Sequence, residues 1–498
     1  MSEMTQERPL YGNFIEQRSS GLKGSGSIGT AVLLVAMCVT AIALIAGGVM
    51  TGAIVGGLAT LGFLSTTRTA RRIGQRIGFL VGRAQGEHQW RSGVFSRNSQ
   101  PECRLPGMLG TLRVLERSDA FGEHGERFAV VKNPRMGGQY TVVVKCVADG
   151  PSMQDQQQIN AWVASYSHVL AAMGHEPALV CGKAITDTAP DPGGRLATMV
   201  ESGRAEGAPA IARTIIDQVV AAAPATSSEN VTYVELTFRG RMLNRKGKED
   251  VILSELARRV PNLRARLAEA GGGAVSMVKA AELAAIVRVA YDPATQPFLE
   301  QASLAGYTDS VPWADAGPVA SQESWGEFLH DSGRSVTWEM LEAPRAAVTE
   351  RSFTALLAPR SDFARKRVAL IYRPHTPAEA AEVSENDVDA AVFNADQGKK
   401  RISARSKRKV NATERSRDEV AGGAGMTRFY ALITATVLAD DRGDLDQAVS
   451  TIESNAAAVL MGLRRSYGSQ AAAFAATLPV GFVPWEHTVV PDSIREQL

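Results

Sequence analysis

RFAVVKNPRMGGQYTVVVKCVA, residues 127–148, contains two apolar, β-branched runs on either side of a turn-rich Arg-Met-Gly-Gly. Runs of this composition that are bounded by glycine and proline are typical of β-strands. The stretch therefore predicts two antiparallel strands, at 127–134 and 139–148, joined by a short turn.

Helical and strand patterns alternate after this pair. Apolar residues recur every three or four positions from 156 to 174, as on one face of a helix, and residues 178–188 again have strand composition. A second helical stretch, PAIARTIIDQVVAAA (209–223), precedes a strand at 230–240. The order β-β-α-β-α-β predicts an antiparallel sheet with helices on one face, as in ferredoxin-like α+β folds.

The later part of the chain predicts a second unit of mixed strands and helices. It follows an Ala- and Leu-rich helical stretch that starts at Lys246. Its expected elements are strands at 335–343, 352–359, 366–374 and 428–438 and helices at 377–420 and 445–465. The near alternation suggests a divergent copy of the first unit, although no sequence self-similarity is strong enough to assert a repeat.

A long apolar tract precedes these units. No charged residue occurs from Gly24 to Thr67, which as one helix would extend about twice the hydrocarbon thickness of a bilayer. The tract is too long for a signal peptide and predicts a transmembrane helical hairpin over 28–66. Arginines after the tract and basic residues before it place both termini in the cytoplasm of a two-span plasma-membrane protein.

Small residues recur every four positions within the second predicted span, at Gly48, Gly52, Gly56 and Thr60. Such a stripe lets another helix approach closely. Two partners remain open, the first helix of the same hairpin and a helix of another subunit.

The expected organisation is an α+β fold in six segments. The segments are an N-terminal cytosolic tail at 1–27, the hairpin at 28–66, a basic juxtamembrane segment and loop at 67–126, a first α+β subdomain at 127–245, a mainly helical segment at 246–345 and a second α+β subdomain at 346–498.

Composition sets limits on function. The chain has 54 basic and 52 acidic residues and a net charge of +2, so no overall field favours nucleic acid. Its four cysteines are scattered, without the spacing of a zinc site or a disulfide framework, which fits a reducing compartment.

The sequence contains no recognisable catalytic motif. A phosphate-binding loop needs Gly-Lys followed by Ser or Thr, but Gly182-Lys183 precedes Ala184 and Gly247-Lys248 precedes Glu249. The seven histidines lack partners at metal-ligand spacing, and neither HExxH nor GxSxG occurs. We therefore predict a protein that is not an enzyme and binds no cofactor or metal.

One basic run is the strongest local charge feature. It comprises Lys399, Lys400, Arg401, Arg405, Lys407, Arg408 and Lys409, with no acidic residue among them. Three interpretations remain open: a solvated helix face, a site for an acidic partner protein, and a site for nucleic acid or anionic lipid. The absence of aromatic residues from the run disfavours base stacking.

Several short matches carry a resemblance to a known group of proteins. They are Tyr11-Gly12 and Ser20-Gly21-Leu22 before the apolar tract, PECRLPGML (101–109), INAWVASYSHVLAAMGHEPAL (159–179) and YGSQAAAFAATLPVGF (467–482). With them the chain resembles a family of actinobacterial proteins encoded on conjugative elements. The apolar tract resembles the PrgI-type subunit of type IV secretion, and the C-terminal part is similar to the N-terminal domain of the VirB-type ATPase. Residues around 250–345 show no resemblance to this family.

This resemblance implies a non-enzymatic inner-membrane scaffold of a type IV secretion or conjugation channel that anchors a separately encoded ATPase. The expected partners are that ATPase, other channel subunits, membrane lipids and further copies of the chain, and contact with nucleic acid stays open. The alternatives are a core membrane subunit of a type VII secretion machinery and a membrane-tethered enzyme. Within the C-terminal match, SQAAAFAATLPVG (469–481) is interpreted either as a hinge separated from its motor or as a core strand or packed turn ended by Pro479 and Gly481.

Overall fold

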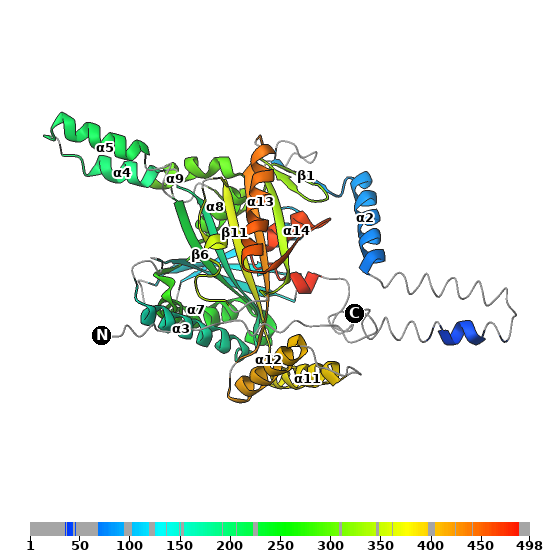
Figure 1. The fold of residues 1–498 in the computed structure, drawn as a ribbon. Helices are drawn as coiled ribbons and strands as arrows, with labels where there is room; N and C mark the ends of the chain where they lie inside the picture. The colour runs from blue at the N-terminus through cyan, green and yellow to red at the C-terminus, as the bar shows by residue number, and fades with distance from the viewer. Residues whose placement is uncertain are drawn as a thin grey trace. The chain divides into compact units, whose positions relative to one another are not determined.

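The computed structural model contains two compact units, one within Trp90–Phe482 and one within Glu16–Gln89 and Val483–Leu498 (Figure 1). The described residues are 35, 37–42, 45, 68–93, 102–118, 125–150, 154–222, 228–307, 311–396 and 404–487, except 136, 149, 192, 206, 345–347, 361, 424 and 441.

The predicted transmembrane hairpin is corrected by the structure. No helix within the described residues is both long enough and apolar enough to cross a membrane. The assignment of the chain as a two-span plasma-membrane protein with cytoplasmic termini is wrong on this finding. Most of 28–66, including Gly48, Gly52, Gly56 and Thr60, lies outside the described residues, so the packing predicted for that stripe is not tested.

The strands of the described chain form one 13-stranded sheet, in place of the two ferredoxin-like subdomains that the sequence predicted. The order along it is β1-β8-β9-β10-β12-β11-β5-β6-β4-β3-β2, while β13 pairs with β10 and β7 with β4. The strands are β1 (Gln89–Arg91), β2 (Arg113–Ser118), β3 (Arg127–Asn133), β4 (Gln139–Val147), β5 (Leu179–Pro190), β6 (Ser228–Arg239), β7 (Ala274–Met277), β8 (Ala320–Glu323), β9 (Phe328–His330), β10 (Gly333–Glu342), β11 (Arg365–Pro374), β12 (Thr427–Leu438) and β13 (Gly462–Arg465).

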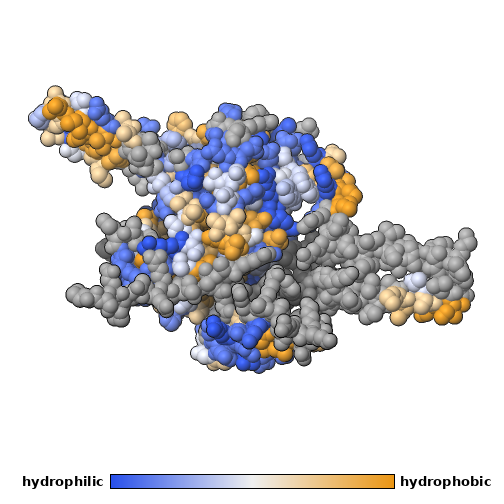
Figure 2. All heavy atoms as spheres, in the orientation of Figure 1, coloured by the Kyte–Doolittle hydropathy of each residue, from blue (hydrophilic) through white to orange (hydrophobic). Residues whose placement is uncertain are grey.

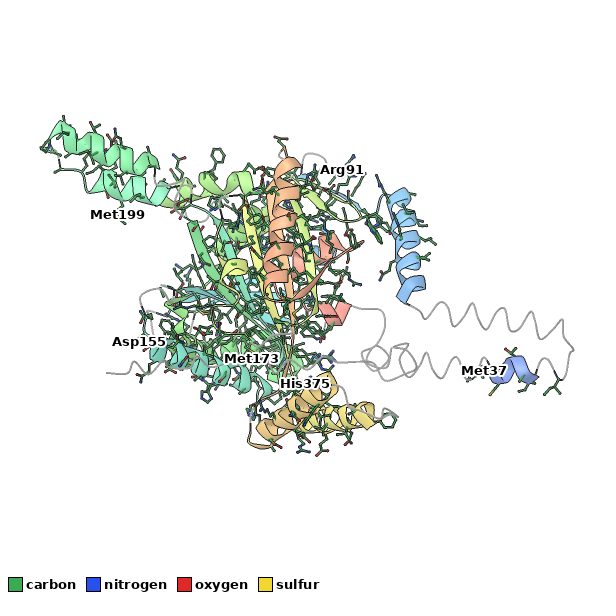
Figure 3. All side chains as sticks on the ribbon, viewed as in Figure 1. Met37, Arg91, Asp155, Met173, Met199 and His375 are labelled. Atoms are coloured by element: carbon green, nitrogen blue, oxygen red, sulfur yellow. The ribbon has the colours of Figure 1, made fainter. Side chains whose placement is uncertain are left out.

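Helices connect these strands and cover both faces of the sheet. In the unit within Trp90–Phe482 they are α3 (Gln156–Gly174), α4 (Gly194–Ser202), α5 (Ala210–Ala222), α6 (Gly240–Leu243), α7 (Glu249–Leu267), α8 (Ala280–Tyr291), α9 (Gln296–Leu304), α10 (Thr354–Leu357), α11 (Pro377–Asp396), α12 (Ala404–Ala421), α13 (Arg442–Ala458) and α14 (Gln470–Ala476), whereas α2 (Arg68–Gln85) belongs to the other unit. α3 follows the predicted bounds. Its N-cap residue is Asp155, labelled in Figure 3, whose carboxylate accepts a hydrogen bond from Gln158 N at 2.7 Å.

The two halves of the sheet have the same topology. The first half has the spatial order β3-β4-β6-β5 and the second the order β9-β10-β12-β11. Each half also has a helical hairpin between two strands that are consecutive along the chain. In the first half α4–α5 connects β5 to β6, and in the second half α11–α12 connects β11 to β12. A further helix and a short strand follow in both, α7 with β7 and α13 with β13. The halves meet where β5 pairs antiparallel with β11, so the structure contains the internal repeat that the sequence alone left undecided.

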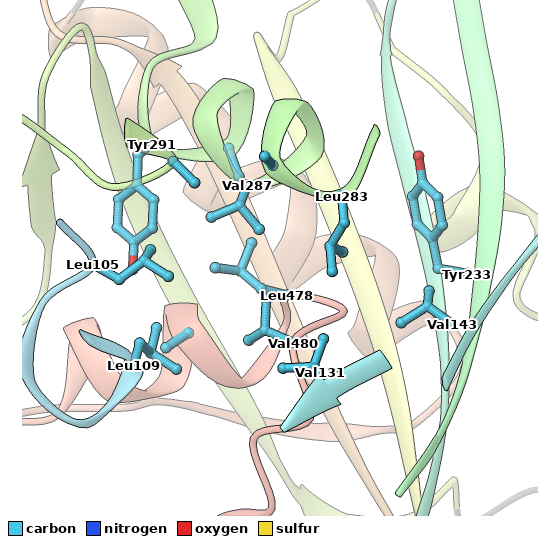
Figure 4. Packing of buried hydrophobic residues seen from close by; sticks show 14 of the residues in the cluster. Leu105, Leu109, Val131, Val143, Tyr233, Leu283, Val287, Tyr291, Leu478 and Val480 are labelled. Carbon is cyan, nitrogen blue, oxygen red and sulfur yellow. The ribbon is translucent and has the colours of Figure 1, made fainter. Parts of the chain in front are cut away.

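Strand β4 shows why both faces of the sheet must be covered. Val143 packs in the cluster that includes α8 and α14 (Figure 4), whereas Val142 and Val144 pack with α3 and α7 on the other face. In the second half, α13 covers the same face of the sheet as α3 and α7. A strand that is buried on both sides has a continuous apolar sequence without alternation, which is the pattern of 139–148.

Candidate interaction surface

The feature that distinguishes one end of the sheet is the helical hairpin between β5 and β6. Both strands have twelve residues, and their terminal residues Pro190 and Ser228 are paired. The hairpin α4–α5 extends beyond this end of the sheet (Figure 1). The chain therefore leaves the sheet at Pro190, passes through the hairpin, and re-enters the sheet at the neighbouring Ser228.

Local sequence signals account for the two helices. Asp191 Oδ1 accepts a hydrogen bond from Gly193 N at 2.8 Å, and Gly193 has a φ of 79°, so the chain turns before α4. Pro209 precedes α5, a favoured position because proline lacks the amide hydrogen that a first helical turn leaves unpaired. Arg204, in the connection, binds Asp217 of α5 with 2.6 Å between Nη2 and Oδ1.

The hairpin exposes large apolar side chains. Ile211, Ile215 and Val219 are 73%, 54% and 59% exposed and recur every four residues along α5, while Met199 of α4 is 70% exposed. Figure 2 shows apolar residues gathered on this hairpin, and Figure 3 labels Met199. No residue of α5 is buried.

This exposure is unusual because helical stability in proteins comes mainly from burying an apolar face. Isolated helices shorter than roughly 12–15 residues are marginal in water, and α4 and α5 have 9 and 13 residues. Contiguous exposed apolar surface marks interaction sites on proteins. The hairpin therefore has the properties of an interaction surface whose partner would complete its packing.

The apolar surface continues at the base of the hairpin. α9 contacts α4 at Gly194, where the nearest side chains are those of Glu300 and Leu304. Phe298 in α9 and Tyr307 after it are each 71% exposed, and α9 has no buried residue. The candidate surface thus consists of α4, α5 and α9.

The basic run is only partly described. Lys399, Lys400 and Arg401 lie outside the described residues, whereas Arg405, Lys407, Arg408 and Lys409 lie in α12. Lys407 is exposed. α12 packs with α11 in the hairpin that corresponds to α4–α5 in the other half of the sheet. The three interpretations of the run stay predictions.

The C-terminal stretch SQAAAFAATLPVG lies in the core, as the second of its two interpretations predicted, but it begins with the helix α14 and contains no strand. Phe474, Leu478 and Val480 are fully buried against the face of the sheet that α8 also covers (Figure 4). The side chain of Gln470 accepts a hydrogen bond from Thr337 N at 2.8 Å and donates one to Thr337 O at 3.0 Å. The stretch is thereby fixed to β10 and to the apolar core.

Charged residues also lie under this segment. Lys183 and Glu235 form an ion pair with both side chains fully buried, and Glu235 Oε2 accepts a hydrogen bond from Gly481 N at 3.0 Å. Arg367 donates from Nε to Thr477 Oγ1 at 3.2 Å, and its guanidinium lies 4.6 Å from the centre of the Phe474 ring. Burial, the largest cause, lowers the pKa of Arg367 to about 10.

One buried histidine adjoins this region. His330 is fully buried, with Nδ1 2.6 Å from Tyr291 O and Nε2 2.7 Å from Ser335 Oγ. Burial lowers the pKa of His330 to about 4, because desolvation disfavours the charged ring. Both ring nitrogens are occupied by hydrogen bonds within the core, which identifies its role as structural.

The other polar side chains of the described residues include possible metal ligands and the residues buried under α14. Within the described ranges, no three or more His, Cys, Asp or Glu residues lie together as a metal-ion site would require. On the α14 side Lys183 pairs with Glu235 and Arg367 bonds Thr477 through Nε, whereas Arg367 Nη1 and Nη2 have no hydrogen-bond partner among the described residues. The absence of enzyme activity and of a cofactor stays a prediction.

The interaction surface itself was missed by the sequence reasoning. The helix at 209–223 was predicted, but α4 was not, and nothing was inferred from the composition of the pair. The available signal was that Ile211, Ile215, Ile216, Val219 and Val220 occupy about half of the circumference of one short helix. A short helix with so wide an apolar face is expected to be buried or to meet a partner.

Comparison with known proteins gives no assignment: no protein-family model matches the chain, and no curated protein matches it either.

Proposed function

We propose that this chain is a non-enzymatic scaffold subunit of a type IV secretion or conjugation channel, and that it binds the separately encoded ATPase through the hairpin α4–α5. The observation that carries the proposal is the exposed apolar stripe Ile211, Ile215 and Val219 on a helix with no buried residue. An amphipathic helix with apolar residues at such intervals is suited to a hydrophobic groove of a partner.

The choice of partner rests on the sequence resemblance. Residues 467–482 are similar to a stretch of the VirB-type ATPase, whereas the chain itself has no phosphate-binding loop. In a scaffold the motor must come from a second polypeptide, and a large rigid sheet that presents one hairpin at its end is a suitable platform for it.

The test is copurification of the full chain with a VirB-type ATPase encoded in the same locus. We expect Ile211→Asp combined with Ile215→Asp to reduce the recovered ATPase at least about tenfold, because each change places a charge in an apolar contact. Val251→Asp on α7 is the matched control, since Val251 is 47% exposed on a helix elsewhere in the chain.

Recovery of the ATPase with Val251→Asp should equal that of the unmodified chain. Equal recovery with the double variant would show that the hairpin does not bind the ATPase. No recovery with the unmodified chain would overturn the proposed function as a whole.

A further inference from the structure

α2 is a strongly amphipathic helix in the unit formed within Glu16–Gln89 and Val483–Leu498. Its sequence is RTARRIGQRIGFLVGRAQ, residues 68–85. Ile73, Ile77, Leu80 and Val81 are 56%, 57%, 57% and 51% exposed. At 3.6 residues per turn these four positions, spaced i, i+4, i+7 and i+8, lie on one side of the helix. Figure 2 shows apolar residues along one side of α2.

The other side of α2 is basic. The helix contains arginines at 68, 71, 72, 76 and 83 and no acidic residue. By the same periodicity the positions of Arg68, Arg71 and Arg72 lie opposite the apolar stripe, whereas those of Arg76 and Arg83 flank it. Arg76 and Arg83 are exposed. α2 therefore has a net side-chain charge of +5, because its sequence contains five arginines and no acidic residue.

The turn after the helix packs on its basic side. Phe79, which is 6% exposed, stacks on His88 with the ring centroids 4.1 Å apart. At Gly82 an added Cβ would lie 2.9 Å from Glu87 Oε2 and 3.0 Å from His88 Nε2, so this side is closely covered. Phe79 and Gly82 lie among the arginine positions, and the apolar stripe on the far side is exposed.

We propose that α2 lies flat on an anionic lipid surface, with the apolar stripe in the acyl boundary and the arginines among the headgroups. Charge complementarity identifies the occupant, because a helix with five arginines and no acid is attracted to negatively charged headgroups. Such binding is peripheral and needs no helix that crosses the bilayer. The proposal is independent of the ATPase contact.

The composition of the stripe favours lipid over a protein groove. Protein interfaces concentrate their binding energy in large anchors, mainly Trp, Tyr and Arg, that fill pockets. The exposed stripe contains only aliphatic side chains, and the one aromatic residue of α2, Phe79, is stacked on His88. Insertion into the acyl boundary requires only apolar area and no defined pocket.

The test is cosedimentation of the full chain with vesicles of phosphatidylcholine alone or with about 30% phosphatidylserine, a composition that supplies the negative surface potential. We expect tighter binding to the anionic vesicles, weakened by salt. Arg76→Gln with Arg83→Gln should weaken it about 25-fold, at about fivefold for each lost charge. Ile77→Asp should weaken it at least about tenfold.

The controls are matched in chemistry and exposure. Arg266→Gln and Val251→Asp change an exposed arginine and an exposed valine on α7 and should leave vesicle binding unchanged. Amide hydrogen exchange supplies a local readout: the amides of 73–85 should gain protection with anionic vesicles. Unchanged binding by the α2 variants, or unchanged exchange in α2, overturns the proposal. Binding of α2 to soluble polyanions but not to vesicles also overturns it.

Discussion

Lys183 on β5 and Glu235 on β6 are directly opposite each other in the sheet, and their side chains form an ion pair with 2.9 Å between Nζ and Oε1. Both side chains are fully buried. The second carboxylate oxygen of Glu235 accepts a hydrogen bond from Gly481 N, so the pair also fixes the chain after α14. Removing two charges from water is costly, and the pair is tolerated because each charge is opposed by the other.

The first prediction is that Glu235→Ala lowers the free energy of unfolding by about 3–5 kcal/mol, because it leaves Lys183 buried without a counter-charge. Urea denaturation followed by circular dichroism measures this loss. The double change Lys183→Met with Glu235→Leu should be less destabilising than Glu235→Ala, although Gly481 N still loses its acceptor. A double variant that is as unstable as the single one would contradict this account of the pair.

The second prediction concerns Gly481, which has a φ of +73°. A Cβ at this position would lie 2.3 Å from Thr141 Oγ1, so Gly481→Ala combines backbone strain with a clash inside the core. We expect a loss of at least about 2 kcal/mol in unfolding free energy. Gly423→Ala is the control, because Gly423 has a φ of +93° but no atom within 4 Å of the added Cβ. Equal losses for the two variants would show that Thr141 does not matter.

Several elements of the sheet were predictable because local composition agrees with the fold. The elements that lie within two residues of their predicted bounds include β3, β4, α3, β11 and β12. The strand predicted at 352–359 was wrong, because the segment contains the short helix α10 and no strand. A short apolar run does not distinguish a helix from a strand. The predicted helix 445–465 ends at Ala458, because Leu460 has a φ of +53° and the chain turns into β13.

The arrangement of the elements was not predictable in the same way. The joining of the two halves depends on pairing between β5 and β11, strands nearly two hundred residues apart, and no local signal specifies such a pairing. The role of 469–481 was similarly undetermined, because its small apolar residues fit a hinge as well as a core. Only the contacts of Gln470 and Gly481 with distant strands decide for the core.

The third prediction follows from His330, whose pKa burial lowers to about 4 from the usual 6.5. Between these values the unfolded chain binds a proton at this position that the folded chain does not, so stability falls as pH decreases from about 6.5 to about 4. Over that window the histidine accounts for up to about 3 kcal/mol. The positive charge of Arg367 also lowers the pKa of His330, whereas the negative charge of Asp292 raises it.

His330→Gln removes this titration and keeps a side chain that hydrogen-bonds. The difference in unfolding free energy between the unmodified chain and this variant should therefore shrink as pH decreases from 6.5 to 4, while carboxylate titrations common to both cancel. A difference that is constant across the window would show that His330 does not titrate as its burial requires.

The last prediction separates the hairpin α4–α5 from the stability of the sheet. Pro190 and Ser228 are paired neighbours, so replacing residues 191–227 by Asn-Gly closes β5 and β6 with a short turn of a kind common in antiparallel hairpins. No residue of α5 is buried, and the contact of α4 with α9 is confined to the base of the hairpin. We expect the unfolding free energy to change by no more than about 1 kcal/mol, whereas recovery of the ATPase is lost.

A matched deletion of α11–α12 is a different case, because Ala380, Val388 and Ala391 of α11 are buried and their loss exposes apolar surface. If removal of α4–α5 instead unfolds the chain, the hairpin belongs to the core and its exposed isoleucines need another explanation.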